Sequence, residues 1–208
     1  MEINWESQVL SSVSKVIPQI SCLEIDIEKL HEVATELSED SFSINYAGNT
    51  NTVPKEYIRK TMLINTLNFV FTDFLTSVKY KIGNYSDTDA MVYQIDKALD
   101  EGIPLTQGRF MRDMNLKEFK RLFTGNIEMP MADEKVKILN NVGDILVTKY
   151  GGDWINFIDD GPKKLYDNGK GLVERLVRDF KRFDDHSIFE NEKVYFLKLA
   201  QLAFWGIH

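Results

Sequence analysis

Hydrophobic residues follow one another with almost no polar face along residues 57–74, YIRKTMLINTLNFVFTDF. Apolar positions on every side of a helix are typical of a helix buried in a core, and this run is too short and too interrupted to span a bilayer. We therefore predict a buried central helix that extends to about Val78. Four polar side chains lie within the run or at its end: Asn65, Thr66, Asn68 and Asp73. Because a buried amide needs hydrogen-bond partners, two interpretations are open: these groups tie the helix to neighbouring loops, or they line a polar pocket for a heterocycle.

Apolar residues recur at intervals of three and four in other stretches and predict further helices. We expect them over residues 1–20 up to Pro18, 27–37, 87–99, 116–123, 132–150, 163–166, 172–183 and 192–207, the last one buried. Asp26, Ser86 or Asp87, and Asn115 are suited to be N-caps, and Glu118 completes a capping box with Asn115. Residues 23–27 alternate and indicate a short extended piece. The polar stretch 38–54 is long for a connection, so it is either a plain surface loop or a lid over a substrate.

Together these patterns predict a mainly α fold with few or no strands, because no strand–helix–strand series is seen. The 208 residues, 43% of them hydrophobic, are enough for one domain with a real core, and we expect a single helical domain over residues 1–208.

The charge of the chain limits the kinds of partner. A net charge of −7 argues against a long duplex-binding surface, which needs a basic face, but a small nucleotide needs only one or two cations. The single Cys22 excludes an internal disulfide framework and fits a reducing compartment. The first residues, MEINWESQVL, show no basic segment before an apolar run, so we expect no signal peptide, a cytoplasmic location and no membrane partner. The three histidines are far apart and no Cys/His spacing predicts a zinc site.

Familiar catalytic and phosphate-binding motifs are absent from the sequence. The neighbouring acids Asp184 and Asp185, like Asp159 and Asp160, would point in different directions on a helix, so neither pair is a ready-made acid–base pair. Lys198 is more informative because nearly every neighbour in KVYFLKLAQLAFW is apolar. It either extends its ammonium to the surface or is buried against a carboxylate or a phosphate.

Four segments, taken in order, resemble the queuosine salvage protein family, the queuosine 5′-phosphate N-glycosylases. They are INTLNFVF (64–71), ALDEGIPLT (98–106), IEMPMADEKVKILNNVGDILVTKYGGDWINFI (127–158) and LVERLVRDFKRFDDHSIFENEKVYFLKLAQLAFW (172–205). They are similar to the family's DALNF or DTLNF helix, its ALEEGIPIT-like turn, its E-x-P-L-x-x-E-R stretch, and its Y/F-x-K-R-A-Q segment after an FRDE-type loop. The resemblance runs from about residue 8 to the end of the sequence.

The resemblance implies a mainly helical fold like that of DNA glycosylases and an activity in queuosine salvage. The expected reaction is hydrolysis of the N-glycosidic bond of queuosine 5′-monophosphate, which releases queuine for tRNA modification. The expected partner is therefore this small nucleotide, and the resemblance implies no metal or redox cofactor.

The sequence departs from the family pattern at several positions. Asn65 stands where the family usually has Asp, Leu199 replaces the Arg of K-R-A-Q, and Gly206 stands where Asp is usual. The family's proposed catalytic Asp lies in an A-D-Y-R-V-P-Q segment that has no match here. With the apolar final stretch, this leads us to expect a truncated chain, a homo-oligomer or partner that covers the C-terminal face, or a degenerate homologue.

Cleavage at C1′ passes through an oxocarbenium-like transition state, which requires a carboxylate nearby and donors for the departing base. We expect Asn65 and Asn68 to hold the deazaguanine and Phe69 to stack on it. Lys198 is the expected catalytic residue, paired with the phosphate or with the missing carboxylate. Further substrate-binding residues are expected at Asp73, Asn156 and Asp185. Two alternatives stay open, a non-catalytic binding protein for a deazaguanine nucleoside and a helical interaction module.

Overall fold

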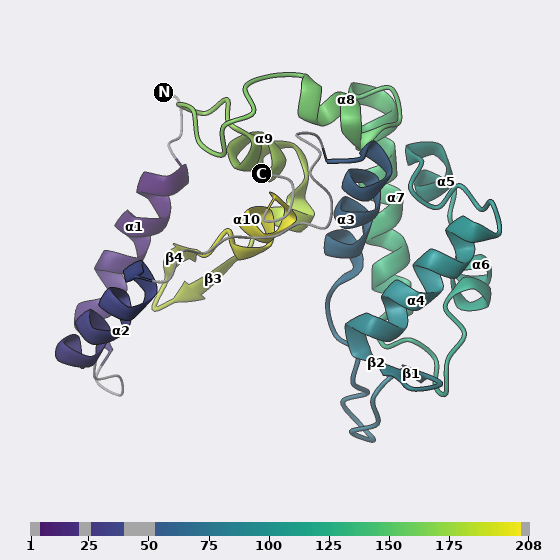
Figure 1. The fold of residues 1–208 in the computed structure, drawn as a ribbon, viewed down its shortest axis with the longest axis horizontal. Coiled ribbons are helices and arrows are strands. Elements are labelled where there is room, and N and C mark those ends of the chain that lie inside the picture. The colour runs from purple at the N-terminus through teal and green to yellow at the C-terminus, as the bar shows by residue number, and fades with distance from the viewer. Residues whose placement is uncertain (1–4, 21–25, 40–52, 205–208) are drawn as a thin grey trace.

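The computed structural model describes residues 5–20, 26–39 and 53–204, and the fold of this part is mainly α, as predicted. Three groups of elements follow one another across the molecule (Figure 1). Helices α3 to α8 form one end. The C-terminal elements α9, η2, β3, β4 and α10 lie in the middle, and α1 and α2 lie at the other end.

The first group is built around α3 (Lys55–Leu67), which packs against α4 (Asp87–Asp100), α7 (Ala132–Lys149) and α8 (Trp154–Asp159). Two short helices, α5 (Gly108–Arg112) and α6 (Leu116–Leu122), cover the far side of α7. Helix α5 approaches α7 so closely that a Cβ atom on Gly143 would lie 2.3 Å from the backbone nitrogen of Arg112. Asn115 caps α6 by accepting a hydrogen bond from the Glu118 amide at 3.0 Å, which confirms that predicted cap.

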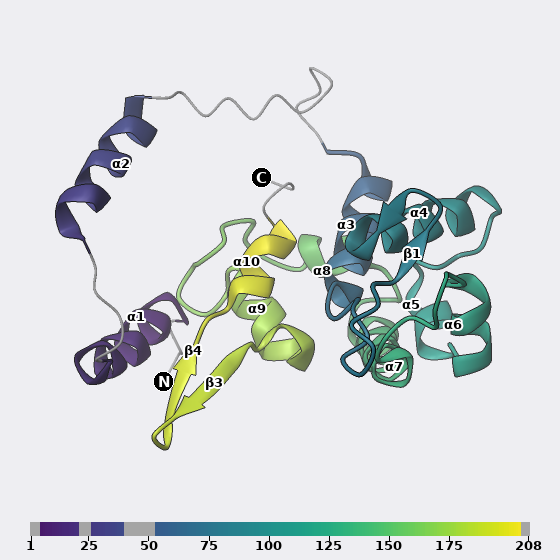
Figure 2. The ribbon, with the colours of Figure 1, turned by 90° about the horizontal axis from the view of Figure 1, so that it is seen from below.

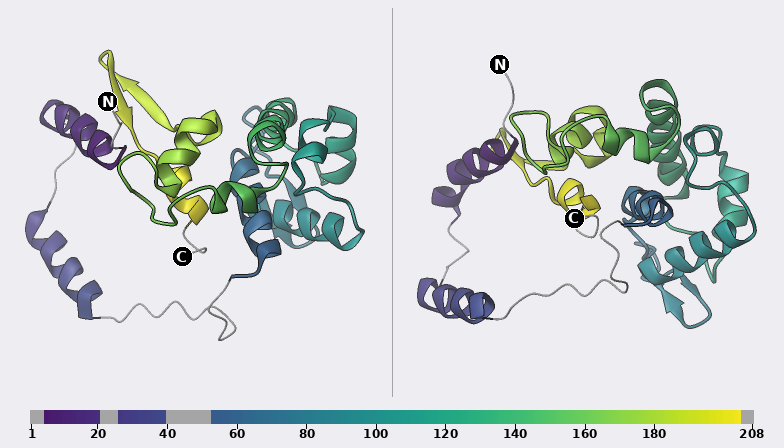
Figure 3. Two further views of the ribbon diagram at one scale, coloured as in Figure 1. Left: turned by 90° about the horizontal axis from the view of Figure 1, so that it is seen from above. Right: turned by 45° about the horizontal axis from the view of Figure 1, so that its top comes forward.

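The second group contains α9 (Leu172–Asp179), the 3-10 turn η2 (Lys181–Phe183) and α10 (Lys198–Phe204), which packs on both α9 and α3. Both views of Figure 3 place α10 on the side that faces α3. The antiparallel hairpin of β3 (His186–Phe189) and β4 (Glu192–Tyr195) extends from it, with His186 opposite Tyr195. A smaller hairpin, β1 (Lys81–Ile82) and β2 (Tyr85–Ser86), precedes α4.

The N-terminal elements are α1 (Trp5–Val16), η1 (Ile17–Gln19) and α2 (Ile27–Glu39). Helix α1 is attached to β4, where Ser12 accepts a hydrogen bond from the Tyr195 amide at 3.1 Å. Helix α2 stands apart from the rest in Figure 2, and its described side chains, including Ile27 and Leu30, are exposed.

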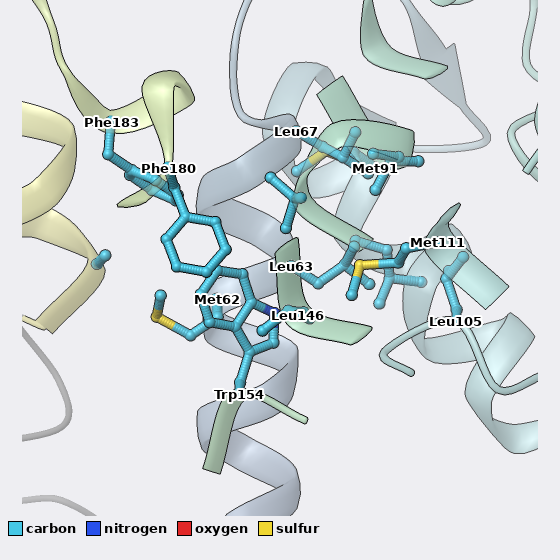
Figure 4. Packing of buried hydrophobic residues seen from close by; sticks show 14 of the residues in the cluster. Met62, Leu63, Leu67, Met91, Leu105, Met111, Leu146, Trp154, Phe180 and Phe183 are labelled. Atoms are coloured by element: carbon cyan, nitrogen blue, oxygen red, sulfur yellow. The ribbon is translucent and has the colours of Figure 1, made fainter. Parts of the chain in front are cut away.

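The core is continuous from the C-terminal elements to α5. Met62, Leu63 and Leu67 of α3 lie at its centre, with Trp154 and Phe180 on one side and Met91 and Met111 on the other (Figure 4). The Trp154 and Phe180 rings are 4.9 Å apart. The predicted burial of the central helix is therefore confirmed for Met62, Leu63 and Leu67, whereas Tyr57 near its start is exposed.

Three predicted helices were wrong in extent. The central helix ends at Leu67, not near Val78, because Asn68 leaves the helical conformation and Val70 adopts a positive φ of 46°. Beyond that point Phe71 and Thr72 pair with Tyr80 and Lys79, and the chain turns back through an exposed loop that contains Leu75. The sequence offers no glycine or proline there to mark the change.

The buried helix predicted over 192–207 starts only at Lys198, because residues 192–195 form β4. The left-handed residues Glu190 and Asn191 make a two-residue turn that returns β3 into β4, and such a turn is typical of tight hairpins. The helix expected over 172–183 ends at Asp179, and none forms over 163–166. The extended piece at 23–27 and the loop at 38–54 lie mostly outside the described residues.

Candidate functional site

The chain segment that follows α3 is held by a buried lysine of α7. Lys135 has no exposed surface, and its Nζ donates to the carbonyl oxygens of Leu67 and Val70 at 3.3 Å each and to that of Phe69. The same Nζ lies 3.7 Å from the centre of the Phe69 ring. Lys135 reaches this place because it lies on the apolar face of α7, three residues after Ala132 and four before Leu139, both of them buried.

A second cation, Arg182, comes from η2 and reaches the same ring. Its Cζ lies 4.7 Å from the centre of the Phe69 ring, and its Nε donates to the carbonyl oxygen of Thr66 at 2.9 Å. Its Nη2 is buried without a hydrogen-bond partner. We call Phe69, Lys135 and Arg182 the Phe69 cluster; Phe69 and Arg182 are half-buried, so the cluster reaches the surface.

Two carboxylates follow Arg182 in the loop that leads to β3. Asp185 accepts the backbone N–H of Lys198 at 3.1 Å with Oδ2, while its Oδ1 is buried without a partner. Asp184 places Oδ2 at 3.6 Å from Lys193 Nζ, and its Oδ1 is likewise buried without a hydrogen bond. Loop 182–185 thus holds three of the four buried polar side-chain atoms without partners in the described part of the chain. Such atoms are costly, so their concentration at one place calls for an explanation.

The electrostatics of the cluster are dominated by two like charges in a dry environment. Burial, and then the nearby positive charge of Arg182, lower the pKa of Lys135 to about 7. Burial also lowers the pKa of Arg182, while the negative charge of Asp185 acts in the opposite direction. Within the described residues, no carboxylate comes within ion-pair distance of Lys135 or Arg182. An aromatic ring, two cations and an unpartnered carboxylate oxygen are suited to an anionic ligand that carries a flat ring.

The structure brings some of the predicted site residues to this cluster. Phe69 is part of it, and Asp185 joins it to the start of α10. Asn65, in the last turn of α3, donates to the Thr61 carbonyl oxygen at 2.9 Å and is half-buried. Asn68 faces α4, where its Oδ1 accepts the Thr88 hydroxyl at 2.9 Å.

Two of the predicted site residues make hydrogen bonds within their own local structure. Asp73 accepts the amides of Leu75 and Thr76 in the exposed turn after α3, and these hydrogen bonds lower the pKa of its carboxyl. Asn156 of α8 donates to the Tyr150 carbonyl oxygen at 2.9 Å, next to the end of α7. Neither contacts the Phe69 cluster.

Lys198 is exposed, which agrees with the first of its two alternatives, an ammonium that extends to the surface. Leu197 has a positive φ of 51° and turns the chain into α10, which leaves Lys198 at the solvated start of that helix. Its side chain makes no hydrogen bond or ion pair with any described residue. Its proposed catalytic role stays a prediction.

Sequence analysis missed Lys135 and Arg182. The signal for Lys135 was its spacing, since a lysine that falls into the apolar face of a strong helix is unusual. Arg182 lies between Phe180 and Phe183, both fully buried, and only the 3-10 turn directs its side chain to α3.

A cavity of about 540 Å³ lies elsewhere, where the segments GIPLT and GGDW meet. Arg59, Thr106, Arg109 and Asp153 are among its lining residues. Arg59 is occupied by a two-point contact with Asp153, at 3.0 and 2.6 Å, that joins α3 to α8. In the described part of the chain no three His, Cys, Asp or Glu side chains gather as metal ligands. No helix described there has the length and apolar character needed to cross a bilayer.

Comparison with known proteins relates this chain to one family. A family model described as queuosine salvage protein matches residues 48–207. A Mus musculus protein is 29% identical over 146 residues, which are 67% of this chain and 42% of that protein. A Bos taurus protein is 30% identical over 66% of this chain and 41% of its own length, and a Nematostella vectensis protein is 27% identical over 88% and 55%. All three are named queuosine 5′-phosphate N-glycosylase/hydrolase, and this chain spans about half of their length or less.

Proposed function

The chain belongs to the queuosine salvage protein family, and we propose that it acts in hydrolysis of the N-glycosidic bond of queuosine 5′-monophosphate, with release of queuine. In this reaction the bond between C1′ and the base nitrogen breaks, water adds to C1′, and the base leaves with a proton. The names of the relatives support this substrate.

The observation that carries the proposal is the meeting of an aromatic ring, two cations and a free carboxylate oxygen within the matched residues. Phe69 supplies an apolar ring edge for the deazaguanine. We propose that Asp185 Oδ1, which has no hydrogen-bond partner among the described residues, accepts a ribose hydroxyl. We propose that the carboxylates of this loop stabilise the positive charge that develops at C1′.

Lys198 is the residue that we propose to touch the reacting nucleotide. Its backbone N–H donates to Asp185, while its exposed ammonium makes no ion pair with any residue that the structure describes, so we propose that it contacts a bound anion. The lone Cys22 supports a reducing compartment, and we propose the cytoplasm as the place of action.

The test is release of queuine from queuosine 5′-monophosphate, measured by mass spectrometry on the purified chain. Lys198→Ala should lower turnover about 100-fold or more, as expected when a charged contact to the transition state is lost, and Lys198→Arg should also be poor. Lys163→Ala, which removes another exposed lysine, is the matched control and should keep full activity. Release of queuine by Lys198→Ala at the wild-type rate would refute the role of Lys198.

A wild-type chain that binds the nucleotide without releasing queuine would instead be a non-catalytic binding protein of the same family. Calorimetric titration with queuosine 5′-monophosphate, in parallel with the release assay, separates these two functions.

A further inference from the structure

Arg182 of the Phe69 cluster differs from several other arginines in its hydrogen-bond partners. Arg59, Arg112, Arg121 and Arg178 each donate to a carboxylate. Arg175, which is buried, donates to three carbonyl oxygens instead. Arg182 has one carbonyl contact, and its Nη2 is buried without a partner.

The arrangement places this incompletely satisfied guanidinium beside a second buried cation. Lys135 and Arg182 both lie over the Phe69 ring, and the ring gives each only a modest attraction. Two like charges in a dry environment destabilise each other, and no carboxylate in the described residues is hydrogen-bonded to either. The negative charge of Asp185 offsets part of the charge of Arg182.

We propose that the Phe69 cluster is an anion subsite that receives the phosphate monoester of the nucleotide, with Arg182 in contact with the phosphate oxygens and Lys135 as a buried charge behind it. This rests on the proposed function and assigns the phosphate end of its substrate. A guanidinium with a free donor is suited to a phosphate because its planar fork matches two oxygens. Lys135 contacts the ring and the backbone carbonyl oxygens, so it is a positioning residue that holds Leu67–Val70 in place.

The geometry couples anion binding to protonation of Lys135. The groups that face Lys135 are the carbonyl oxygens of the segment after α3 and the charge of Arg182, with Asp185 acting through Arg182. Because its pKa is about 7, Lys135 is mostly neutral at pH 8. A dianion at Arg182 favours the charged amine, so binding should draw a proton from the solvent.

The experiment is calorimetric titration at pH 8 in buffers of different ionisation enthalpy, because a phosphate monoester is already fully ionised there. The probes are queuosine 5′-monophosphate, queuosine and inorganic phosphate. Wild type should take up most of one proton with the monophosphate and with inorganic phosphate, and none with queuosine. Arg182→Gln should weaken binding of the monophosphate about tenfold or more and leave binding of queuosine unchanged.

Variants of Lys135 give the decisive comparison. Lys135→Arg keeps a permanent positive charge, so the monophosphate should bind without proton uptake. Lys135→Met should bind it more weakly, also without uptake, and if Lys135→Met does not fold, Lys135→Arg still carries the test. Lys137→Met changes an exposed lysine of the same helix and should behave as wild type.

The failure of this subsite is distinguishable from failure of the proposed function. Proton uptake with inorganic phosphate or the monophosphate supports the subsite even where no queuine is released. The subsite is refuted if the monophosphate and the nucleoside bind equally well without proton uptake. It is also refuted if proton uptake persists in Lys135→Arg. Both conclusions hold whatever the release assay gives. The absence of binding by all three probes also overturns it.

Discussion

Two regions of this molecule contain buried charged side chains beside an aromatic ring, and they differ in how these side chains are hydrogen-bonded. In the first region, around α9, Glu174 accepts the amides of Asp167, Gly169 and Gly171, and Arg175 donates to three carbonyl oxygens while it lies 5.0 Å from the Phe157 ring centre. In the second region, the Phe69 cluster, two cations share a ring while neighbouring polar atoms lack partners.

The difference indicates what each region is for. The hydrogen bonds of Glu174 and Arg175 fix the loop before α9 to α8 and leave no obvious place for a ligand. The Phe69 cluster retains unpaired positive charge near the surface, which costs stability and is typical of a functional site. We therefore expect changes in the first region to act on folding and changes in the second to act on binding.

The largest effect is expected in the α9 region. Glu174→Leu leaves three backbone N–H groups without their acceptor, two of them part-buried and that of Gly171 buried, and should lower the free energy of unfolding by about 3–5 kcal/mol. Urea denaturation measures it. Glu28→Leu, on the exposed face of α2, is the control and should change stability little. A loss of less than about 1 kcal/mol in Glu174→Leu would remove the contrast between the two regions.

A smaller effect, of opposite sign, is expected from Lys135 as the pH rises. Its folded-state pKa of about 7 lies below the unfolded value of 10.5, so the unfolded chain binds more protons between these values and stability increases with pH. The free energy of unfolding of wild type relative to Lys135→Met should rise by about 1 kcal/mol per pH unit from pH 7 to 9. Urea denaturation at three pH values gives this difference, and groups common to both proteins cancel in it. A difference that does not change with pH would show that Lys135 keeps its proton in the folded state over this range and that burial does not lower its pKa.

The smallest effect is expected for Asn68, which we predict to contribute both to stability and to binding. Its Oδ1 accepts the Thr88 hydroxyl, while its Nδ2 has no partner among the described residues. Asn68→Leu and Thr88→Val each break this bond and should each cost about 1 kcal/mol in thermal or urea unfolding. Only Asn68→Leu removes Nδ2, so only that variant should weaken binding of queuosine 5′-monophosphate. Equal affinities in the two variants would assign Asn68 a purely structural role.

The sequence predicts the helices that have a strong apolar period and clear caps. Residues 132–150 and 116–123 form α7 and α6 nearly as expected, because their spacing and the Asn115 cap act locally. The change at Asn68 and the hairpin at Glu190 depend instead on left-handed residues that are not glycine. Tertiary contacts stabilise these conformations, and local propensity does not reveal them.

Only part of the candidate site could be inferred from the sequence, although all four of its residues lie in the matched segments. Phe69 and Asp185 follow from the resemblance, whereas Lys135 and Arg182 become visible only when α7 and η2 are placed against the end of α3. The choice between the two alternatives for Lys198 could not be made from the sequence, because a run of apolar neighbours does not tell where a helix begins.

The contacts of the Phe69 cluster also have a consequence for the order of folding. The bond from Arg182 to the Thr66 carbonyl oxygen closes a loop of 116 residues, and that from Lys135 to the Leu67 carbonyl oxygen closes one of 68. Closing such loops costs chain entropy before any contact repays it, so long-range contacts of this kind slow folding. The cluster therefore forms only after α3, α7 and η2 have come together, and the proposed anion subsite forms with it.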